Sequence, residues 1–488
     1  MIERISKRRS RQRTAEKGRE YAFVNIIGWF FIGCIAIITI FRGGGNSESA
    51  IVDSLICSLI TFAFVGYHLL HGREFAVPWL RIRFPALVML ATAAWVVVQT
   101  SDRVPESFAY PIWENAGALL GMAVQGSISV AGEDGWNFLM QLSCIMLVAW
   151  ISLQLGRNKH WSRRLLWAIV VAGLANTSYG IVDMLQRLHA TMAGANIDDA
   201  ILGGKFDASI AGTFVNRSHF ATYLSICCVV SGALFADFVF SMDEKRKHDG
   251  SNLFDFHRWR GIDFFILFST VFSCGYLFLG ILMTGARLAL PSVACGMVAI
   301  FFLLMLRNVK LWLPVFLVVV AMCLGVFVFG GQWIVHRFGF FYHGFEIRIA
   351  VYNLTIAAIR DNVWLGTGAG TFERFFPIYR DASVDVGGTW NAAHNSYLEL
   401  AMTLGVPAAA ALVLAVALVW WRCLLGSLRR RQDIAFSLAA TGAGVVIAID
   451  SLFDFAIQSE SVAITLASIF GAGLVQSWSS SANSSPSS

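Results

Sequence analysis

The sequence predicts an all-α fold, a polytopic membrane bundle of about 12 transmembrane helices. Of the 488 residues, 57% are hydrophobic and only 14% are charged, and the mean hydropathy is +0.64. Soluble domains carry roughly 25% charged residues, so this composition excludes an ordinary soluble protein. Apolar runs of about 20 residues recur along the whole chain, and each is long enough to cross a bilayer as a helix.

The apolar runs place the expected spans in order along the chain. They cover 21–41, 51–70, 84–100, 136–155, 165–186, 218–240, 262–283, 287–306, 311–330, 396–421, 435–457 and 460–477. The nine cysteines lie in or at the edges of these runs without a CxxC or Cys/His cluster. We interpret them as buried apolar side chains, not as disulfides or metal ligands, and we expect no metal site and no cofactor.

The charge pattern predicts the orientation of the bundle. With the N-terminus in the cytoplasm, the cytoplasmic segments hold 26 of the 37 Lys and Arg residues, although the outer loops are longer. This asymmetry is what the positive-inside rule requires, and adding or removing one helix would destroy it downstream. We therefore expect the N-terminus to face the cytoplasm.

The two ends of the chain differ from the rest in composition. Segment 1–20 contains eight Lys and Arg residues. Such a segment beside a first membrane helix usually anchors the orientation and contacts anionic lipid; a nucleic-acid-binding tail is the alternative, which we do not favour. The next apolar stretch has full spanning length, which does not fit a cleaved signal peptide. Segment 479–488 is rich in serine, and we expect it to be disordered.

Polar chemistry is concentrated in the loops on the expected outer side, of which the substantial ones are 101–135, 187–217 and 331–395. In the longest of them, apolar residues recur at helical spacing from Ile347 to Ala358. This spacing predicts an amphipathic helix over 346–360 that lies on the membrane surface.

Three arginines lie near the outer ends of expected helices: Arg217, Arg287 and Arg348. An arginine in or near the bilayer is expensive unless something compensates its charge. Each of them could reach the interface by extending its side chain, which is the structural explanation. Three on one face, against the positive-inside bias, would instead suit a diphosphate, which guanidinium groups bind through paired hydrogen bonds.

His394 lies between a polar loop and an apolar run. The pattern Ser396-x-x-Glu399 is typical of a capping box, so we expect a helix to begin there with Glu399 as a partner in the cap. His394 would then lie just outside a helix N-terminus, whose partial positive charge favours anions such as phosphate. Histidine titrates near neutral pH and can act as a general base toward a sugar hydroxyl. A purely structural interfacial histidine is the alternative.

The glycines Gly366, Gly368 and Gly370 form a GxGxG pattern. It lacks the strand–turn–helix setting of a dinucleotide fingerprint, so we interpret it as a tight turn that lets the backbone approach a neighbour. Asp450 and Asp454 lie four residues apart and are expected to share one helix face near its outer end. They suggest either a proton path or, more simply, partners for an outer arginine.

Together these pieces resemble the O-antigen ligase and Wzy-type polymerase superfamily, the bacterial membrane glycosyltransferases that use undecaprenyl-diphosphate-linked glycans. The resemblance is densest from 262 to 415. It rests on Gly212-Thr213-Phe214-Val215-Asn216-Arg217, on Thr284-Gly285-Ala286-Arg287, on Arg348 with Asp361 and the turn at 365–372, on His394-Asn395-x-Tyr397-Leu398, and on Asp450-Ser451-Leu452-x-Asp454-Phe455. Ser218, Val363, Met402, Thr403 and Asp450 depart from the residues usual in the superfamily.

The resemblance implies a GT-C-like bundle, with a catalytic region at 262–415 between transmembrane helices at 21–261 and 416–478. It implies a metal-independent, inverting transfer of a glycan from undecaprenyl diphosphate, on the periplasmic side of the bacterial inner membrane. His394 would activate the acceptor hydroxyl, and the three arginines would neutralise the departing diphosphate. The supporting residues would be Asn395, Gly366, Gly368, Gly370 and Asp454.

Two alternatives stay open at this point. A glycolipid transporter or flippase would also have many helices and intramembrane acids, but we find neither related halves nor broken midplane helices. Among enzymes, the motifs do not separate a ligase from a polymerase, and the acceptor could be a glycan, lipid A core or a protein.

Overall fold

The computed structural model describes residues 23–40, 47–72, 74–192, 209–249, 259–307, 320, 341–384, 388–430 and 432–478. In this part of the chain the regular secondary structure is helical, which confirms the all-α class. The basic segment 1–20, the expected span 311–330 apart from residue 320, and the tail 479–488 lie outside the described residues.

Ten helices in the described part are long and apolar enough to cross a membrane. They are Phe23–Ile40, α2 (Ser47–Leu70), α3 (Arg83–Thr100), α5 (Gly132–Gly156), α6 (Lys159–Met192), α8 (Arg217–Asp249), α9 (Gly261–Thr284), α10 (Ala289–Arg307), α15 (Val406–Arg429) and α17 (Glu460–Ser477). A shorter apolar helix, α16 (Ala435–Asp450), lies between the last two. The chain is therefore a polytopic membrane protein.

The centre of the bundle is formed by α8, α16 and α17, which are the most buried helices. Small residues allow these helices to approach their neighbours closely. At Gly471 of α17, a Cβ atom would lie 2.6 Å from the carbonyl oxygen of Ala149 in α5. Such close approach lets helices associate in a membrane, where hydrophobic burial between them contributes little. In contrast, α9 exposes large apolar side chains such as Phe265 and Phe268, as a lipid-facing helix should.

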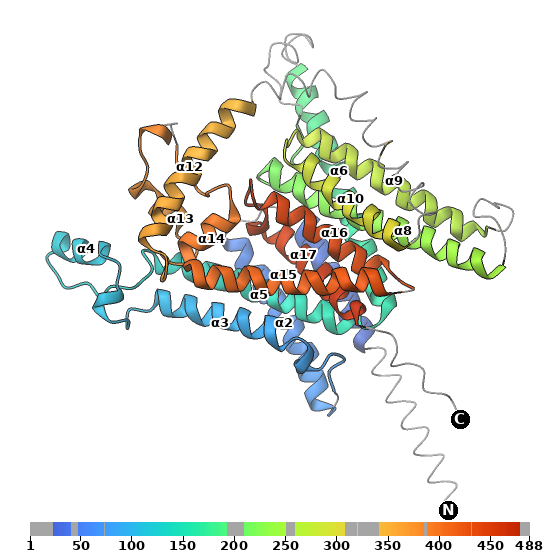
Figure 1. Cartoon of the computed structure of the whole chain (residues 1–488), viewed down its shortest axis with the longest axis horizontal. Coiled ribbons are helices and arrows are strands. Elements are labelled where there is room, and N and C mark those ends of the chain that lie inside the picture. The colour runs from blue at the N-terminus through green and yellow to red at the C-terminus, as the bar shows by residue number, and fades with distance from the viewer. Residues whose placement is uncertain are drawn as a thin grey trace, which may run out of the picture.

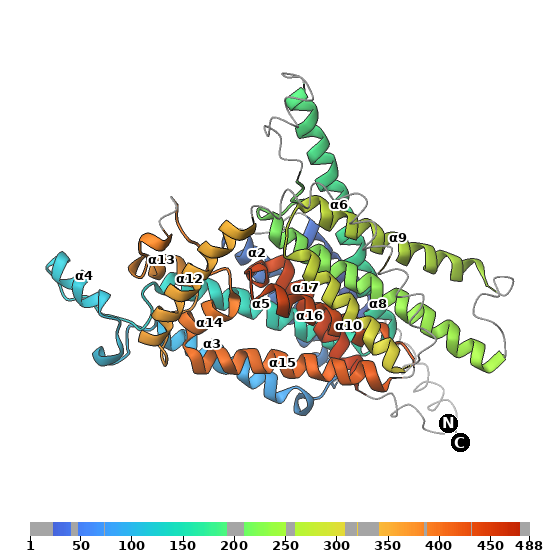
Figure 2. The same cartoon turned by 45° about the horizontal axis from the view of Figure 1, so that its top comes forward.

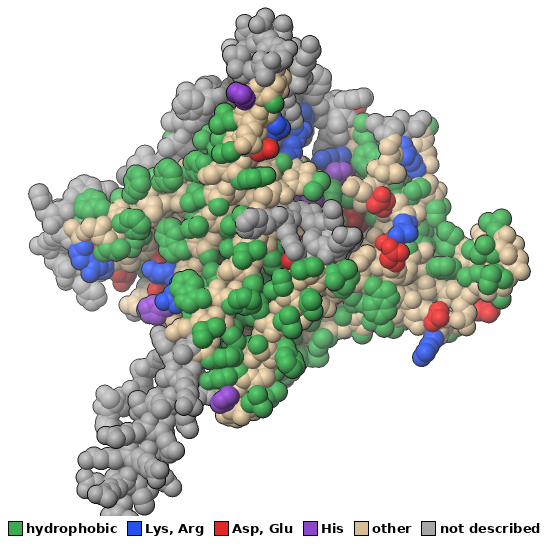
Figure 3. Space-filling view, turned by 180° about the vertical axis from the view of Figure 1, so that it is seen from behind, with side chains coloured by type: hydrophobic (Ala, Val, Ile, Leu, Met, Phe, Trp, Pro, Cys, Tyr) green, Lys and Arg blue, Asp and Glu red, His purple; other side chains and the backbone are tan. Residues whose placement is uncertain are grey.

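The helices described between residues 341 and 404 gather at one end of the bundle (Figure 1). They are α12 (Phe341–Asp361), α13 (Phe372–Phe375) and α14 (Ser396–Leu404). We call this end the loop end. Beyond it, α4 (Ile112–Leu120) stands away from the other helices, and Figure 2 shows α6 extending past the bundle in another direction. Hydrophobic side chains cover much of the face seen in Figure 3, and charged side chains are sparse on it.

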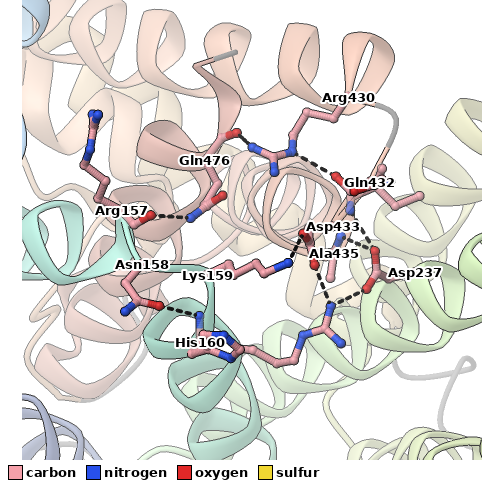
Figure 4. Close-up of polar contacts among 12 residues, drawn as sticks. Arg157, Asn158, Lys159, His160, Asp237, Arg430, Gln432, Asp433, Ala435 and Gln476 are labelled. Carbon is pink, nitrogen blue, oxygen red and sulfur yellow. Dashed lines mark hydrogen bonds and ion pairs between the residues drawn. The ribbon is translucent and has the colours of Figure 1, made fainter. Parts of the chain in front are cut away.

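Away from the loop end, a buried carboxylate, Asp237, joins three helices, and Figure 4 shows its contacts. Asp237 of α8 accepts hydrogen bonds from the backbone N–H groups of Ile434 and Ala435, at 2.7 and 3.3 Å, where α16 begins. The same carboxylate pairs with Arg163 of α6 at 2.8 Å, and Arg163 also pairs with Asp433 at 3.1 Å. These contacts satisfy backbone donors that a helix N-terminus otherwise leaves without partners.

The expected span 396–421 exists, but its predicted start is wrong, because the helix breaks at Gly405. There the chain has φ = 84°, and α14 ends at Leu404 while α15 begins at Val406. Pro407 lies in the first turn of α15, where its missing N–H does no harm. The apolar run continues through the break, so hydropathy could not locate it. As a result, the segment that carries His394 is separate from the membrane-spanning helix.

Two other boundaries also differ from expectation. A helix is present where one was predicted at 346–360, but α12 is longer, from Phe341 to Asp361. The helix predicted at 435–457 ends at Asp450, so Asp454 lies in the turn that follows and not on a helix face shared with Asp450. The described cysteines are free thiols, most of them buried.

Candidate active site

His394 lies directly before the N-cap of α14 and has an unusual backbone. Its φ of 52° falls in the left-handed region, which few non-glycine residues adopt. The hydroxyl of Tyr352, from α12, donates a hydrogen bond of 2.8 Å to the carbonyl oxygen of His394. Strained backbone of this kind persists only where the surroundings hold it, and it often marks functional sites.

The His394 ring is fixed on three sides. Its Nδ1 lies 3.4 Å from Oδ1 of Asp454, close enough for an ion pair but long for a hydrogen bond. The rings of Trp390 and Phe455 meet it edge-on, with centroids at 5.8 and 5.1 Å. The side chain is 23% exposed although Nδ1 itself is buried. The accessible part of the ring is therefore the part away from Nδ1.

Asp454 is a buried carboxylate that faces this imidazole. Its side chain is only 5% exposed, and Oδ1 also accepts a hydrogen bond of 2.9 Å from the backbone N–H of Phe455. Burial raises the pKa of Asp454, but the neighbouring imidazoles of His394 and His219 lower it by more, so that the pKa lies below its usual range. Asp454 is therefore ionised at neutral pH.

A second histidine, to which no sequence motif points, lies against Phe455. His219 is in the first turn of α8, and its ring meets Phe455 edge-on at 4.6 Å. Phe455 thus contacts both imidazoles. Nε2 of His219 is buried and has no hydrogen-bond partner among the described residues. His219 is far from His394 in the chain, so no local pattern could connect the two.

Asp450 plays a different part from the one expected. It lies at the end of α16, and its Oδ1 accepts a hydrogen bond of 2.7 Å from the hydroxyl of Thr222 in α8. Within the described residues, Asp450 and Asp454 form no ion pair with an arginine; Asp454 faces His394 instead. The predicted arginine partner is therefore wrong for Asp454, whose neighbour is an imidazole. For Asp450, the positive charge of Arg348 acts on the carboxylate without a direct ion pair.

Of the three arginines, Arg348 has a direct contact with the turn that carries Asp454. Arg348 of α12 donates a hydrogen bond of 2.6 Å to the carbonyl oxygen of Phe453, next to Asp454. Arg217 begins the helix that carries His219, and its Nη1 lies 3.5 Å from the hydroxyl of Ser209. We call His394, Asp454, Phe455, His219 and Arg348 the His394 cluster.

Arg287 is half-buried in the turn between α9 and α10. A hydrogen bond of 3.1 Å from the N–H of Ile210 to the carbonyl oxygen of Met283 joins the last turn of α9 to the segment that precedes α8. Arg287 is therefore at the loop end, as Arg217 is. In the described part of the chain, no hydrogen bond or ion pair joins Arg287 to the His394 cluster.

The glycine turn packs against α14, as expected of a tight turn that lets the backbone approach a neighbour. Gly366, Gly368 and Gly370 have φ of 69°, 107° and 77°. A Cβ at Gly366 would lie 2.4 Å from the carbonyl oxygen of Thr403, and one at Gly368 would lie 2.1 Å from the hydroxyl of Ser129. The N–H of Gly368 donates to that same carbonyl of Thr403 at 3.0 Å. A bulkier residue at Gly366 would push α14 away from this turn, and one at Gly368 would clash with Ser129, which precedes α5.

Asn395 caps α14, and the predicted capping box is wrong in its residues. The Asn395 side chain accepts from the N–H groups of Tyr397 and Leu398 at 3.1 and 3.0 Å, while its own amide donates to the carbonyl oxygen of Leu452 at 2.9 Å. The Ser396 hydroxyl donates instead to the carbonyl oxygen of Asp454 at 3.1 Å. Asn and Ser are both good caps, so the spacing alone could not choose between them.

Residues 272–413 match the model of a family described as O-antigen ligase. This region resembles the O-antigen ligases. The resemblance expected from the motifs is thereby confirmed. The O-antigen ligase region begins within α9 and ends within α15, and it includes Arg287, Arg348, the glycine turn and His394. Arg217, His219 and Asp454 come from outside it. No curated protein matches the chain.

Within the described residues, no group of three or more His, Cys, Asp or Glu side chains is placed to hold a metal ion. The chemistry available in the His394 cluster is that of an imidazole backed by a carboxylate, with a guanidinium group beside it. This combination can remove a proton from a hydroxyl and attract an anion.

Proposed function

We propose that this membrane enzyme of the O-antigen ligase and polymerase type transfers a glycan from undecaprenyl diphosphate to an acceptor hydroxyl. The observation that carries the proposal is the pairing of His394 with Asp454 within and beside the O-antigen ligase region. A carboxylate at Nδ1 favours the tautomer whose Nε2 is unprotonated. Nε2 is then free to accept a proton from the acceptor.

In the proposed reaction, Nε2 of His394 takes the proton of the acceptor hydroxyl as its oxygen attacks the anomeric carbon of the donor. The bond between that carbon and the diphosphate oxygen breaks, and its electron pair leaves with undecaprenyl diphosphate. Attack from the face opposite the leaving group inverts the anomeric centre. Asp454 stabilises the imidazolium that forms, as the carboxylate of a catalytic triad does.

The arginines would supply the charge that the leaving group needs. Arg348 uses one of its five N–H donors on Phe453, which leaves the others for a phosphate oxygen. Arg217 and Arg287 lie at the same end of the bundle and would contact the diphosphate from α8 and from the α9–α10 turn. Such preorganised positive groups stabilise a transition state in which negative charge moves onto the leaving group, and we assign the reaction no metal ion.

The proposal also includes location and partners. We propose that the N-terminus lies in the cytoplasm and the loop end in the periplasm, with the protein in the bacterial inner membrane; the positive-inside pattern of the sequence supports this orientation. The donor is a lipid-linked glycan. The acceptor is a glycan, lipid A core or a protein.

The test is complementation of a strain in which the gene is deleted. We expect the wild-type gene to restore the surface glycan and His394→Ala to leave it absent, with the variant present in the membrane at wild-type level. Gel analysis of the deletion strain separates the two enzyme types: loss of attachment with lipid-linked polymer retained indicates a ligase, and single repeat units indicate a polymerase. Full glycan transfer by His394→Ala would contradict the proposal, and unimpaired transport of the glycan lipid by that variant would favour a flippase.

A further inference from the structure

Glu399 is a buried carboxyl group that the proposed reaction does not use. It lies in the first turn of α14, and the residue is only 8% exposed. Both of its oxygens accept hydrogen bonds. Oε2 accepts from the backbone N–H of Ala393 at 2.9 Å, and Oε1 accepts from the amide of Gln458 at 2.7 Å.

The two partners of Glu399 belong to the two segments that form the His394 cluster. Ala393 directly precedes His394. Gln458 ends the short helix η7 (Ala456–Gln458), which directly follows Asp454 and Phe455. One carboxyl group is therefore bonded both to the residue before His394 and to the short helix that follows Asp454 and Phe455.

Other hydrogen bonds between these two segments are made by residues that follow His394 in the chain. The N–H of Ser396 donates to the carbonyl oxygen of Ser451 at 2.9 Å, and the amide of Asn395 donates to that of Leu452. These bonds hold the chain after His394. Glu399 holds it before His394, at Ala393. A residue with a positive φ needs support on both sides, since its backbone would otherwise relax to a more common conformation.

We propose that Glu399 is a positioning residue, which holds Ala393 and Gln458 at a fixed separation and thereby keeps the His394 imidazole against Asp454. This inference rests on the proposed function of His394. Glu399 does not touch the reacting atoms; it acts through the backbone on the residues that do.

The chemistry of the two partners predicts which side chains can replace Glu399. Ala393 offers an N–H group, which can only donate, whereas the amide of Gln458 can turn over and accept. A glutamine at 399 can therefore accept from Ala393 through its oxygen and donate to Gln458 through its nitrogen. Leucine keeps the volume but leaves the buried N–H of Ala393 without a partner, which is costly, and it also removes the bond to the amide of Gln458. Aspartate is one methylene shorter and cannot reach both.

The experiment compares purified Glu399→Gln, Glu399→Asp and Glu399→Leu variants, with the lipid-linked glycan extracted from the deletion strain as donor. We expect Glu399→Gln to keep kcat within about threefold of wild type. We expect Glu399→Leu to lower kcat by on the order of 100-fold with little change in the KM for the donor, because a displaced catalytic group costs about that much. Glu399→Asp should fall between them.

Asp237→Asn is the matched control. Asp237 is also a buried carboxylate that accepts backbone N–H bonds (Figure 4), but it lies where α16 begins, whereas Asp454 follows the end of α16. We expect Asp237→Asn to lower the thermal midpoint while kcat stays within about threefold at a permissive temperature. If Glu399→Leu does not fold, Gln458→Ala removes one of the two bonds and should lower kcat by roughly tenfold.

Three outcomes overturn the inference. A Glu399→Gln variant as inactive as the leucine variant would mean that the carboxyl group itself transfers a proton. Wild-type kcat in Glu399→Leu or, should that variant not fold, in Gln458→Ala would mean that neither bond positions His394. A loss of kcat in Asp237→Asn as large as that in Glu399→Leu would mean that general destabilisation explains both. Failure of the proposed function is separate, because it requires that His394→Ala retain activity.

Discussion

Nδ1 of His394 lies 3.4 Å from Oδ1 of Asp454, although one residue precedes α14 and the other follows α16. The 451–455 turn brings them together, since the same turn accepts hydrogen bonds from Arg348, Asn395 and Ser396. An imidazole, a carboxylate and a guanidinium group therefore meet at the loop end. The predictions below test what each of them does.

Asp454→Asn should lower kcat by on the order of 100-fold and leave expression unchanged. The amide can present its N–H to Nδ1, which favours the wrong tautomer of His394, and it cannot stabilise an imidazolium. The check is kcat for glycan transfer by the purified variant. Asp450→Asn is the control, because Asp450 bonds to Thr222 and not to His394. Equal losses of kcat in both variants would argue against a specific role for Asp454.

Arg348→Ala should lower kcat/KM for the donor by roughly 10- to 100-fold, the range expected for a lost hydrogen bond to a charged group. Arg348→Lys should recover part of the loss, because lysine keeps the charge but not the forked pair of donors. Arg374→Ala is a suitable control: Arg374 pairs with Asp134 at 2.9 Å elsewhere at the loop end. If Arg348→Ala binds and transfers the donor normally, Arg348 has only a structural role.

Gly368→Ala should destabilise the protein by about 2 kcal/mol or more. The backbone there has φ = 107°, and the new Cβ would lie 2.1 Å from the hydroxyl of Ser129. Gly388→Ala separates the two effects, since Gly388 has φ = 122° but nothing within 4 Å of an added Cβ. We expect a clearly larger drop in the thermal midpoint in detergent for Gly368→Ala. Equal drops would mean that the contact with Ser129 is unimportant.

The stability of the protein should depend on the ionisation of Glu399. Burial raises its pKa from 4.5 to about 7, against the opposing effect of hydrogen bonds from Ala393 and Gln458. Between these two pH values the folded state holds a proton that the unfolded state has released, so the stability falls as the pH rises. The shift corresponds to on the order of 3 kcal/mol.

Glu399→Gln removes this dependence, because its amide does not titrate. We expect the thermal midpoints of wild type and Glu399→Gln to be similar at pH 5, and the variant to become relatively more stable as the pH rises to 8. Thermal unfolding in detergent at a series of pH values provides the measurement. A difference that stays constant across this range would show that Glu399 does not titrate there.

The helical spans were largely predictable, because a run of about 20 apolar residues has few structures available in a bilayer other than a helix. The interpretation of the glycines at 366–370 as a tight turn also came from local rules. So did the choice of His394, which lies at the junction of a polar loop and an apolar segment. Each of these conclusions depends on residues that are close together in the chain.

The partners of those residues were not predictable in the same way. Asp454 was expected to meet an arginine and faces His394 instead. Glu399 was expected in a cap and holds Ala393 and Gln458. His219 was not singled out, although its ring contacts Phe455. In each case several partners satisfy the same local chemistry, and the choice among them depends on which helices pack side by side.

The sequence by itself thus determined that this is an all-helical membrane protein with a region that resembles the O-antigen ligases and a histidine just before a helix. Only the tertiary structure decided that His394 faces Asp454, that Arg348 binds the turn beside it, and that α14 is separate from α15. The physical reason is the separation along the chain over which each effect acts. Hydropathy and capping act over a few turns of helix, whereas the His394 cluster draws on four elements, from α8 to the turn after α16, that only packing brings together.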